Sequence, residues 1–337
     1  MKKKQLIGLV FVFSICLYML LPLSAQAYSA SQPFVLKCGL ATPPGDVYSR
    51  TIKRLGDNVE KGTNGRIKFK YFYGASLIKK PQFADAVARG IADISAGPIS
   101  FITGKIPSLS PLEIYGAYQL DKFKEMVKSV EPTLQKIFKP KGLHIPMYHY
   151  PGPAIFCHKS KLLKGPEDWK GQKIRLGGRW QSTLGKMWGA SPVFMPPSEL
   201  YLALQRGVIN GYMLVWDIVY GLKLYEVAPF IVDTGFSLNL EVITMNLKKW
   251  NTLTKKDQEI FSAAAREVTE WGYYEILKKQ KKIEADITSK GGTVYHLNQE
   301  ERKRYMKDAY SLWPEVIKVA GPLGNNLVDI LKKFQEK

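Results

Sequence analysis

Hydrophobic and polar residues follow two different periods along the first hundred residues. Apolar and polar side chains alternate over residues 66–73, which is typical of a strand with one solvent-exposed face. Over residues 47–61 apolar side chains recur every three or four positions, as in an amphipathic helix, and apolar strand-like runs cover residues 34–40 and 91–97. Strands that alternate with helices predict an α/β fold with a mainly parallel sheet.

The same alternation continues through the middle of the chain. Residues 120–138 are predicted to be helical, with a break near Pro132, and residues 142–150 to form a strand. The Pro-Gly-Pro sequence at 151–153 interrupts the pattern, after which a new series of strands and helices begins. This interruption predicts the start of a second lobe.

The tail of the sequence is helical and completes a two-lobed plan. A long helix is predicted over residues 254–290, interrupted only at Gly272, and further helices extend to residue 337. We therefore expect one lobe from residues 28–150 with part of 241–337, and a second from residues 151–240. Strands that cross near 150 and 240 would join the lobes and leave a cleft between them.

The N-terminus has the pattern of a secretory signal. Lysines at positions 2–4 precede an apolar run over residues 6–21, and Ala25 and Ala27 supply the small residues of a cleavage site. We predict that residues 1–27 are removed and that the mature protein is periplasmic; an uncleaved membrane anchor is the alternative.

The charge balance indicates the kind of partner. The formal net charge of +20 falls by three when the signal lysines are removed, and the remaining Lys and Arg are spread along the chain. A distributed positive charge favours attraction of small anions, whereas nucleic-acid binding needs a basic face, so we expect no nucleic-acid partner.

Motifs for catalysis, metals or cofactors are missing from the sequence. It contains no GxSxG, GxGxxG, phosphate-binding GxxxxGK[ST] or HExxH motif, and its four histidines have no CxxC nearby. We therefore expect no enzyme activity, no metal and no cofactor. Cys38 and Cys157 survive signal cleavage, and whether they pair cannot be read from their spacing.

The stretch GQKIRLGGRW, residues 171–180, places Arg175 and Arg179 beside three glycines. An arginine keeps its charge at any biological pH, and its planar fork of donors matches a carboxylate or phosphate in two parallel hydrogen bonds. The alternative is a solvated surface pair without a ligand.

Residues 171–211 resemble the solute-binding proteins of tripartite ATP-independent periplasmic (TRAP) transporters. Those proteins show a G-x-K-x-R strand, then G-A-x-P-x-x-M, then a helix of the form E-x-Y-x-A-L-Q-x-G-x-x-D-G. The matching residues are Gly171, Lys173, Arg175, Gly189, Ala190, Pro192, Met195, Glu199, Tyr201, Ala203, Leu204, Gln205, Gly207 and Gly211. The N-terminal segments TNGRIKFKYFYGASL and ARGIADIS fit the family as well, so the resemblance covers essentially the whole mature chain.

The resemblance implies a two-lobed periplasmic binding protein fold of type II, with a long helix that spans both lobes. It also implies a mostly monomeric protein that closes on an organic anion and delivers it to TRAP membrane permease subunits. The arginine of the K-x-R strand binds the carboxylate of the solute in this family, and the matching residue here is Arg175, not Arg179.

Departures from the family pattern suggest the kind of solute. Ala154, Ile155 and Phe156 occupy the neighbourhood where many relatives place a second arginine, and Leu214 stands where they carry a polar residue. Fewer polar partners favour a monocarboxylate with an aromatic or aliphatic body. Arg175 would bind its carboxylate, and the expected walls are Trp216, Tyr48, Tyr150, Phe236 and Leu214.

Three alternatives remain open from the sequence. The protein could be a sensor subunit that presents the same solute class to a receptor, or a binder of C4-dicarboxylates. A secreted hydrolase is the third, although no nucleophile and base motif supports it.

Overall fold

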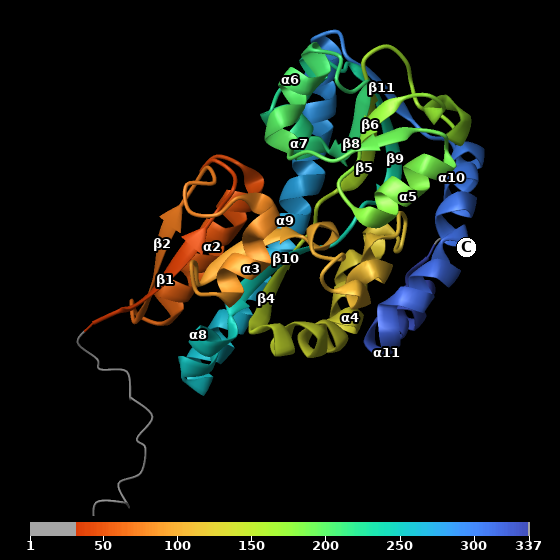
Figure 1. Cartoon of the computed structure of the whole chain (residues 1–337). Coiled ribbons are helices and arrows are strands. Elements are labelled where there is room, and N and C mark those ends of the chain that lie inside the picture. The colour runs from red at the N-terminus through yellow and green to blue at the C-terminus, as the bar shows by residue number, and fades with distance from the viewer. Residues whose placement is uncertain (1–31, 336–337) are drawn as a thin grey trace, which may run out of the picture. The chain divides into compact units, whose positions relative to one another are not determined.

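The computed structural model describes residues 32–335, and the predicted signal peptide, residues 1–27, lies outside them. The described strands form two sheets (Figure 1). The first sheet has the order β2-β1-β3-β10-β4. Its strands are β1 (Phe34–Gly39), β2 (Ile67–Phe72), β3 (Ile94–Pro98), β4 (Leu143–His149) and β10 (Glu241–Asn246).

Helices cover the first sheet as the sequence pattern requires. They are α2 (Val47–Gly62), α3 (Phe83–Ala88), α4 (Phe123–Phe138) and α8 (Leu247–Thr252). Strand β1 runs parallel to β3, whereas β10 is antiparallel to both β3 and β4. The late strand β10 therefore returns the chain to the first sheet.

The second sheet has the order β11-β9-β5-β8-β6-β7. Its strands are β5 (Pro153–His158), β6 (Lys173–Arg175), β7 (Ser191–Val193), β8 (Gly211–Val215), β9 (Phe230–Ser237) and β11 (Thr293–His296). The helices α5 (Arg179–Met187), α6 (Leu200–Gln205) and α7 (Trp216–Gly221) connect them. The chain passes between the sheets through residues 150–152 and 238–240, where the sequence predicted crossings.

A long helix, α9 (Lys255–Ser289), contacts elements of both sheets (Figure 1). It packs on α2 and β4 of the first sheet and on α7 and β11 of the second. The expected interruption at Gly272 is wrong, because Gly272 continues the helix. A Cβ at Gly272 would meet Thr51 and His149 at 3.8 Å, an ordinary contact distance, so this face of α9 lies against α2 and β4.

The predicted break of α4 at Pro132 is also wrong. The proline removes a hydrogen bond to the carbonyl of Lys128. Both residues lie on the exposed face of α4, where water can solvate that carbonyl. The opposite face of the helix is buried, and α4 therefore continues to Phe138.

The C-terminal helices α10 (Gln299–Ser311) and α11 (Trp313–Leu331) complete the described chain. Helix α11 packs on α4 and on the 3₁₀-helix Pro107–Glu113, and Gly321 bends it with φ of 67°. Cys38 lies in β1 and Cys157 in β5, and both are buried free thiols, so they do not form a disulfide.

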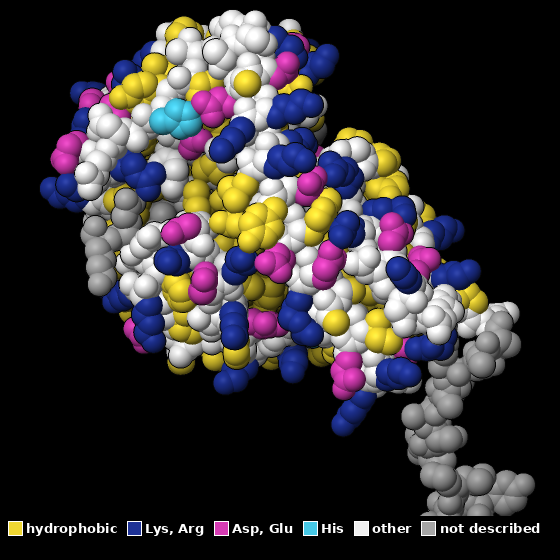
Figure 2. Space-filling model, turned by 180° about the vertical axis from the view of Figure 1, so that it is seen from behind, with side chains coloured by type: hydrophobic (Ala, Val, Ile, Leu, Met, Phe, Trp, Pro, Cys, Tyr) yellow, Lys and Arg dark blue, Asp and Glu magenta, His cyan; other side chains and the backbone are white. Residues whose placement is uncertain are grey.

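Charged residues are distributed over the surface. Figure 2 shows Lys and Arg side chains scattered over one face among acidic and apolar ones. Within residues 32–335, no helix is long and apolar enough to cross a membrane. The same residues contain no group of three or more His, Cys, Asp or Glu side chains that could hold a metal ion.

Candidate functional site

Arg175 is the last residue of β6 and points its side chain into the interior. Only 2% of the residue is exposed. Its Nε donates to the backbone oxygen of Met195 at 3.0 Å, and Nη1 donates to that of Met213 at 3.3 Å. These two neutral carbonyls hold the guanidinium in place, while Nη2 donates to none of the residues that the structure describes.

The charge of Arg175 has no carboxylate partner among the described residues. Burial lowers the pKa of the guanidinium to about 10, which still leaves it protonated at neutral pH. A buried charge that is held only by neutral groups is costly, and an anion would relieve that cost. The geometry therefore provides an anion-binding position with three N–H donors to spare, one at Nη1 and two at Nη2.

A pocket between elements of the two sheets contains the Arg175 side chain. From the second sheet and its connections it is lined by Arg175, Gly177, Gln181, Pro197, Leu214, Val215 and Ile218. From the first sheet and its connections it is lined by Tyr48, Lys80, Pro98, Ser100, Phe101 and Glu241, and Pro151, Leu238 and Asn239 come from the crossing segments. Its free volume is about 50 Å³. One water needs roughly 10–15 Å³ on this measure, so the space suits a small solute.

An ion pair lies in the part of the pocket wall that comes from the first sheet and its connections. Lys80 Nζ lies 3.1 Å from Glu241 Oε1 and 4.4 Å from the centre of the Tyr48 ring. Burial raises the pKa of the Glu241 carboxyl, and Lys80 opposes that rise. Because Lys80 and Glu241 neutralise each other, the Arg175 charge is the one that is left for a solute.

Gly177 keeps the approach to Arg175 open. A Cβ at this position would sit 3.1 Å from Nη1 and 3.3 Å from Nη2 of Arg175, closer than most side-chain contacts. The backbone N–H of Gly177 donates to Gln181 Oε1 at 2.9 Å, which fixes the turn after β6. Glycine here therefore leaves the donors of the guanidinium uncovered.

Tyr48 and Leu214, both expected as walls, line this pocket together with Arg175. Trp216 and Tyr150 do not line it. Trp216 turns into an apolar cluster beside the second sheet and donates from Nε1 to Asp233 at 3.0 Å. Tyr150 packs against Phe123 and Tyr273, with ring centres 5.1 and 4.7 Å away.

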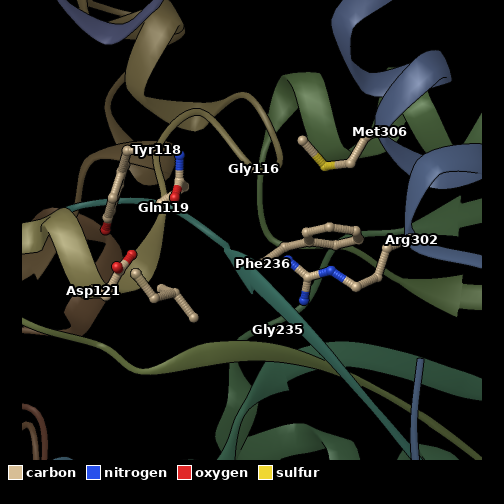
Figure 3. A pocket seen from close by; sticks show the side chains of 9 residues that line it. Gly116, Tyr118, Gln119, Asp121, Gly235, Phe236, Arg302 and Met306 are labelled. Atoms are coloured by element: carbon tan, nitrogen blue, oxygen red, sulfur yellow. The ribbon is translucent and has the colours of Figure 1, made fainter. Parts of the chain in front are cut away.

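Phe236 lines a different pocket, shown in Figure 3. That pocket has a volume of about 270 Å³ and includes Gly116, Asp121 and Arg302. Arg302 stacks 4.6 Å above the Phe236 ring and donates to the Thr234 carbonyl at 2.8 Å. Although this pocket is larger, its arginine already has partners, so the pocket at Arg175 is the better candidate for an anion.

Sequence reasoning missed the polar residues of the Arg175 pocket. Lys80, Gln181 and the pair Asn239 and Glu241 come from three separate segments, and none belongs to a motif. A usable signal was present at residues 238–241, where two polar residues flank the apolar Leu240 in an extended segment. Side chains two apart in such a segment share a side.

Arg179 lies outside the pocket, at the first position of α5. Its side chain is exposed and stacks 5.0 Å from the centre of the Trp180 ring. The two arginines of the GQKIRLGGRW stretch thus have different environments.

A family model described as "Bacterial extracellular solute-binding protein, family 7" (DctP) matches residues 38–319. The chain belongs to the DctP family, the solute-binding proteins of TRAP transporters. It is thus a solute-binding protein and not an enzyme.

Individual relatives agree with the family assignment. The sialic acid-binding periplasmic protein SiaP of Vibrio cholerae is 25% identical over 298 residues, which cover 86% of this chain and 91% of that protein. A solute-binding protein of Albidiferax ferrireducens is 26% identical over 252 residues, covering 73% of this chain and 72% of that protein.

Solved structures confirm the predicted fold. The Bordetella pertussis receptor DctP7, described as binding pyroglutamic acid, superposes with a TM-score of 0.81 at 16% identity, over 88% of this chain and 99% of that one. The fold is the two-sheet α/β fold of TRAP solute-binding proteins, with the long helix present.

Proposed function

We propose that this protein is the periplasmic receptor of a TRAP transporter, which captures an organic anion through Arg175 and delivers it to the membrane permease. Membership of the DctP family supports the receptor role. A periplasmic location and cleavage after Ala27 belong to the same proposal, which the signal pattern of residues 1–27 supports. N-terminal sequencing of the protein from a periplasmic fraction should begin at Tyr28.

One observation carries the role of Arg175. Its guanidinium is buried in a pocket between the two sheets, has no carboxylate partner among the described residues, and leaves Nη2 free of hydrogen bonds to them. A carboxylate can accept two parallel hydrogen bonds from such a fork. Exclusion of water from a closed pocket would strengthen that ion pair.

The solute that we propose is a monocarboxylate with an aromatic or aliphatic body. Phe101, Leu214, Val215, Ile218 and Leu238 offer apolar contact in the pocket. Such contact contributes about 25 cal/mol per Å² of apolar surface that is buried. The pairing of Lys80 with Glu241 leaves no second free cation in the pocket lining for a second carboxylate.

Isothermal titration against a panel of acids tests this function. The panel contains aromatic acids, aliphatic monocarboxylates, 2-oxo acids, C4-dicarboxylates and sugar acids. We expect the tightest binding in the first two groups. Tightest binding of a sugar acid or a dicarboxylate would contradict the proposed solute, and binding of no organic anion would contradict the receptor role.

A further inference from the structure

The Arg175 pocket contains a second polar group whose hydrogen-bonding capacity is unused. Asn239 is 7% exposed, and its Oδ1 is fully buried with no hydrogen-bond partner among the described residues. An unsatisfied buried acceptor is costly to a folded protein, so such groups are usually explained by a ligand or a water.

The backbone around Asn239 is held firmly. Asn239 follows β9 and precedes β10, between Leu238 and the fully buried Leu240. Its backbone carbonyl accepts from the hydroxyl of Tyr118 at 3.3 Å. The unused acceptor of the side chain is thus a feature of an ordered, packed segment and lies in the lining of the same pocket as Arg175.

The Lys80 and Glu241 charges and the side-chain oxygen of Gln181 have partners within the protein. Lys80 pairs with Glu241, and Gln181 Oε1 accepts from Gly177. A solute therefore meets an uncompensated positive charge at Arg175 and a buried, unpaired acceptor at Asn239 Oδ1. Its chemical complement is a single carboxylate together with a hydrogen-bond donor.

We infer that the pocket selects small monocarboxylates that also carry an N–H or O–H donor, with Asn239 Oδ1 as the acceptor of that donor. The inference rests on the proposed function, because it takes the carboxylate to be bound at Arg175. It makes Asn239 a specificity residue of the same site. An acid of the same shape without the donor leaves Oδ1 unpaired, and a site built around a hydrogen bond rejects such an analogue.

Matched acids that differ only in the donor test the inference. Pyrrole-2-carboxylate and furan-2-carboxylate form one pair, and pyroglutamate and 5-oxotetrahydrofuran-2-carboxylate form another; in each, a ring oxygen replaces the N–H. We expect the N–H member of the tighter-binding pair to bind at least about tenfold more tightly in isothermal titration.

The variant Asn239→Leu, with folding checked by circular dichroism, removes the acceptor and keeps a similar volume. In this variant we expect the dissociation constants of the two members of the pair to differ by less than about threefold. Equal binding of the two members by the wild type, tighter binding of the oxygen member, or an unchanged ratio in Asn239→Leu would overturn the inference. Binding of none of the four acids would also overturn it.

The two proposals fail in different ways. If the acids bind, lose affinity in Arg175→Ala and show no preference for the donor, the role of Asn239 is wrong and the receptor function stands. If no acid of the wider panel shows binding that depends on Arg175, the proposed function itself is wrong.

Discussion

The carboxylate of Glu113 accepts a hydrogen bond from the backbone N–H of Trp180 at 2.7 Å. Glu113 ends the 3₁₀-helix Pro107–Glu113, whereas Trp180 lies in the first turn of α5, which follows the Arg175 strand β6. Thr103 Oγ1 donates to the same carboxylate at 2.5 Å. This buried hydrogen bond connects the 3₁₀-helix Pro107–Glu113 to the start of α5, next to the Arg175 pocket.

Glu113 should make stability depend on pH. Burial raises the pKa of its carboxyl to about 7, against the opposing hydrogen bonds from Thr103 and Trp180. Because the folded protein binds this proton more tightly than the unfolded chain, the contribution is fully present below about pH 4.5 and is lost as the pH rises through about 7. In Glu113→Gln, which keeps an acceptor for Trp180, this dependence should vanish.

Urea unfolding of wild type and Glu113→Gln at pH 5, 6, 7 and 8 measures the effect. The free energy of unfolding of the wild type, relative to the variant, should fall between pH 5 and pH 7 and level off above. A relative stability that rises over this range would show that the carboxyl is not buried as described.

Much of the fold could be predicted because it depends on local periodicity. The predicted helix over residues 254–290 corresponds to α9, Lys255–Ser289, and the crossings near 150 and 240 occur where expected. The errors at Pro132 and Gly272 share a cause. Each is a residue with a low helix propensity and was predicted to interrupt its helix. Tertiary packing of the remaining helix surface overrides such local preferences.

The site was predictable only where residues fall in a motif. Arg175 could be singled out by the strand motif that contains it, whereas Lys80 and Asn239 come together only through folding. Trp216 illustrates the opposite difficulty. It is close to Leu214 in sequence, but its indole points to Asp233 and not into the pocket, which no composition rule could decide.

The missing side chain at Gly177 should matter for binding. In Gly177→Ala the new methyl group would crowd both Nη atoms of Arg175, so the guanidinium must shift or lose access. We expect about tenfold weaker binding of the solute, measured by titration calorimetry. Gly221→Ala is the matched control, because an added Cβ there meets nothing within 4 Å. Equal losses in both variants would argue against the role of Gly177.

Substitutions of Lys80 and Glu241 should have strongly non-additive effects on the free energy of unfolding. Lys80→Met leaves the Glu241 carboxylate buried, with 4% of its side chain exposed, and without its cation. We expect a loss of about 3 kcal/mol in the free energy of unfolding. The double variant Lys80→Met with Glu241→Gln removes both charges and should recover part of that loss. Denaturant titrations of both variants check this, and additive losses would contradict the pairing.

Trp216 should act on stability and not on affinity. Its Nε1 and Gln280 Nε2 each donate to Asp233 Oδ2 at 3.0 Å. Trp216→Phe removes one of these donors from a buried carboxylate, so the free energy of unfolding should fall by about 1–3 kcal/mol. The dissociation constant of the solute should stay within about threefold of wild type. A loss of affinity without a loss of stability would indicate instead that Trp216 contacts the solute.

Solute affinity in Arg175→Ala, set against Arg179→Ala, tests the central claim most directly. Arg175 is buried in the pocket without a carboxylate partner among the described residues, while Arg179 is exposed four residues later. With folding verified by circular dichroism, Arg175→Ala should weaken binding of the best acid of the panel at least about hundredfold, and Arg179→Ala less than about threefold. Binding by Arg175→Ala as tight as by wild type would show that the carboxylate is bound elsewhere.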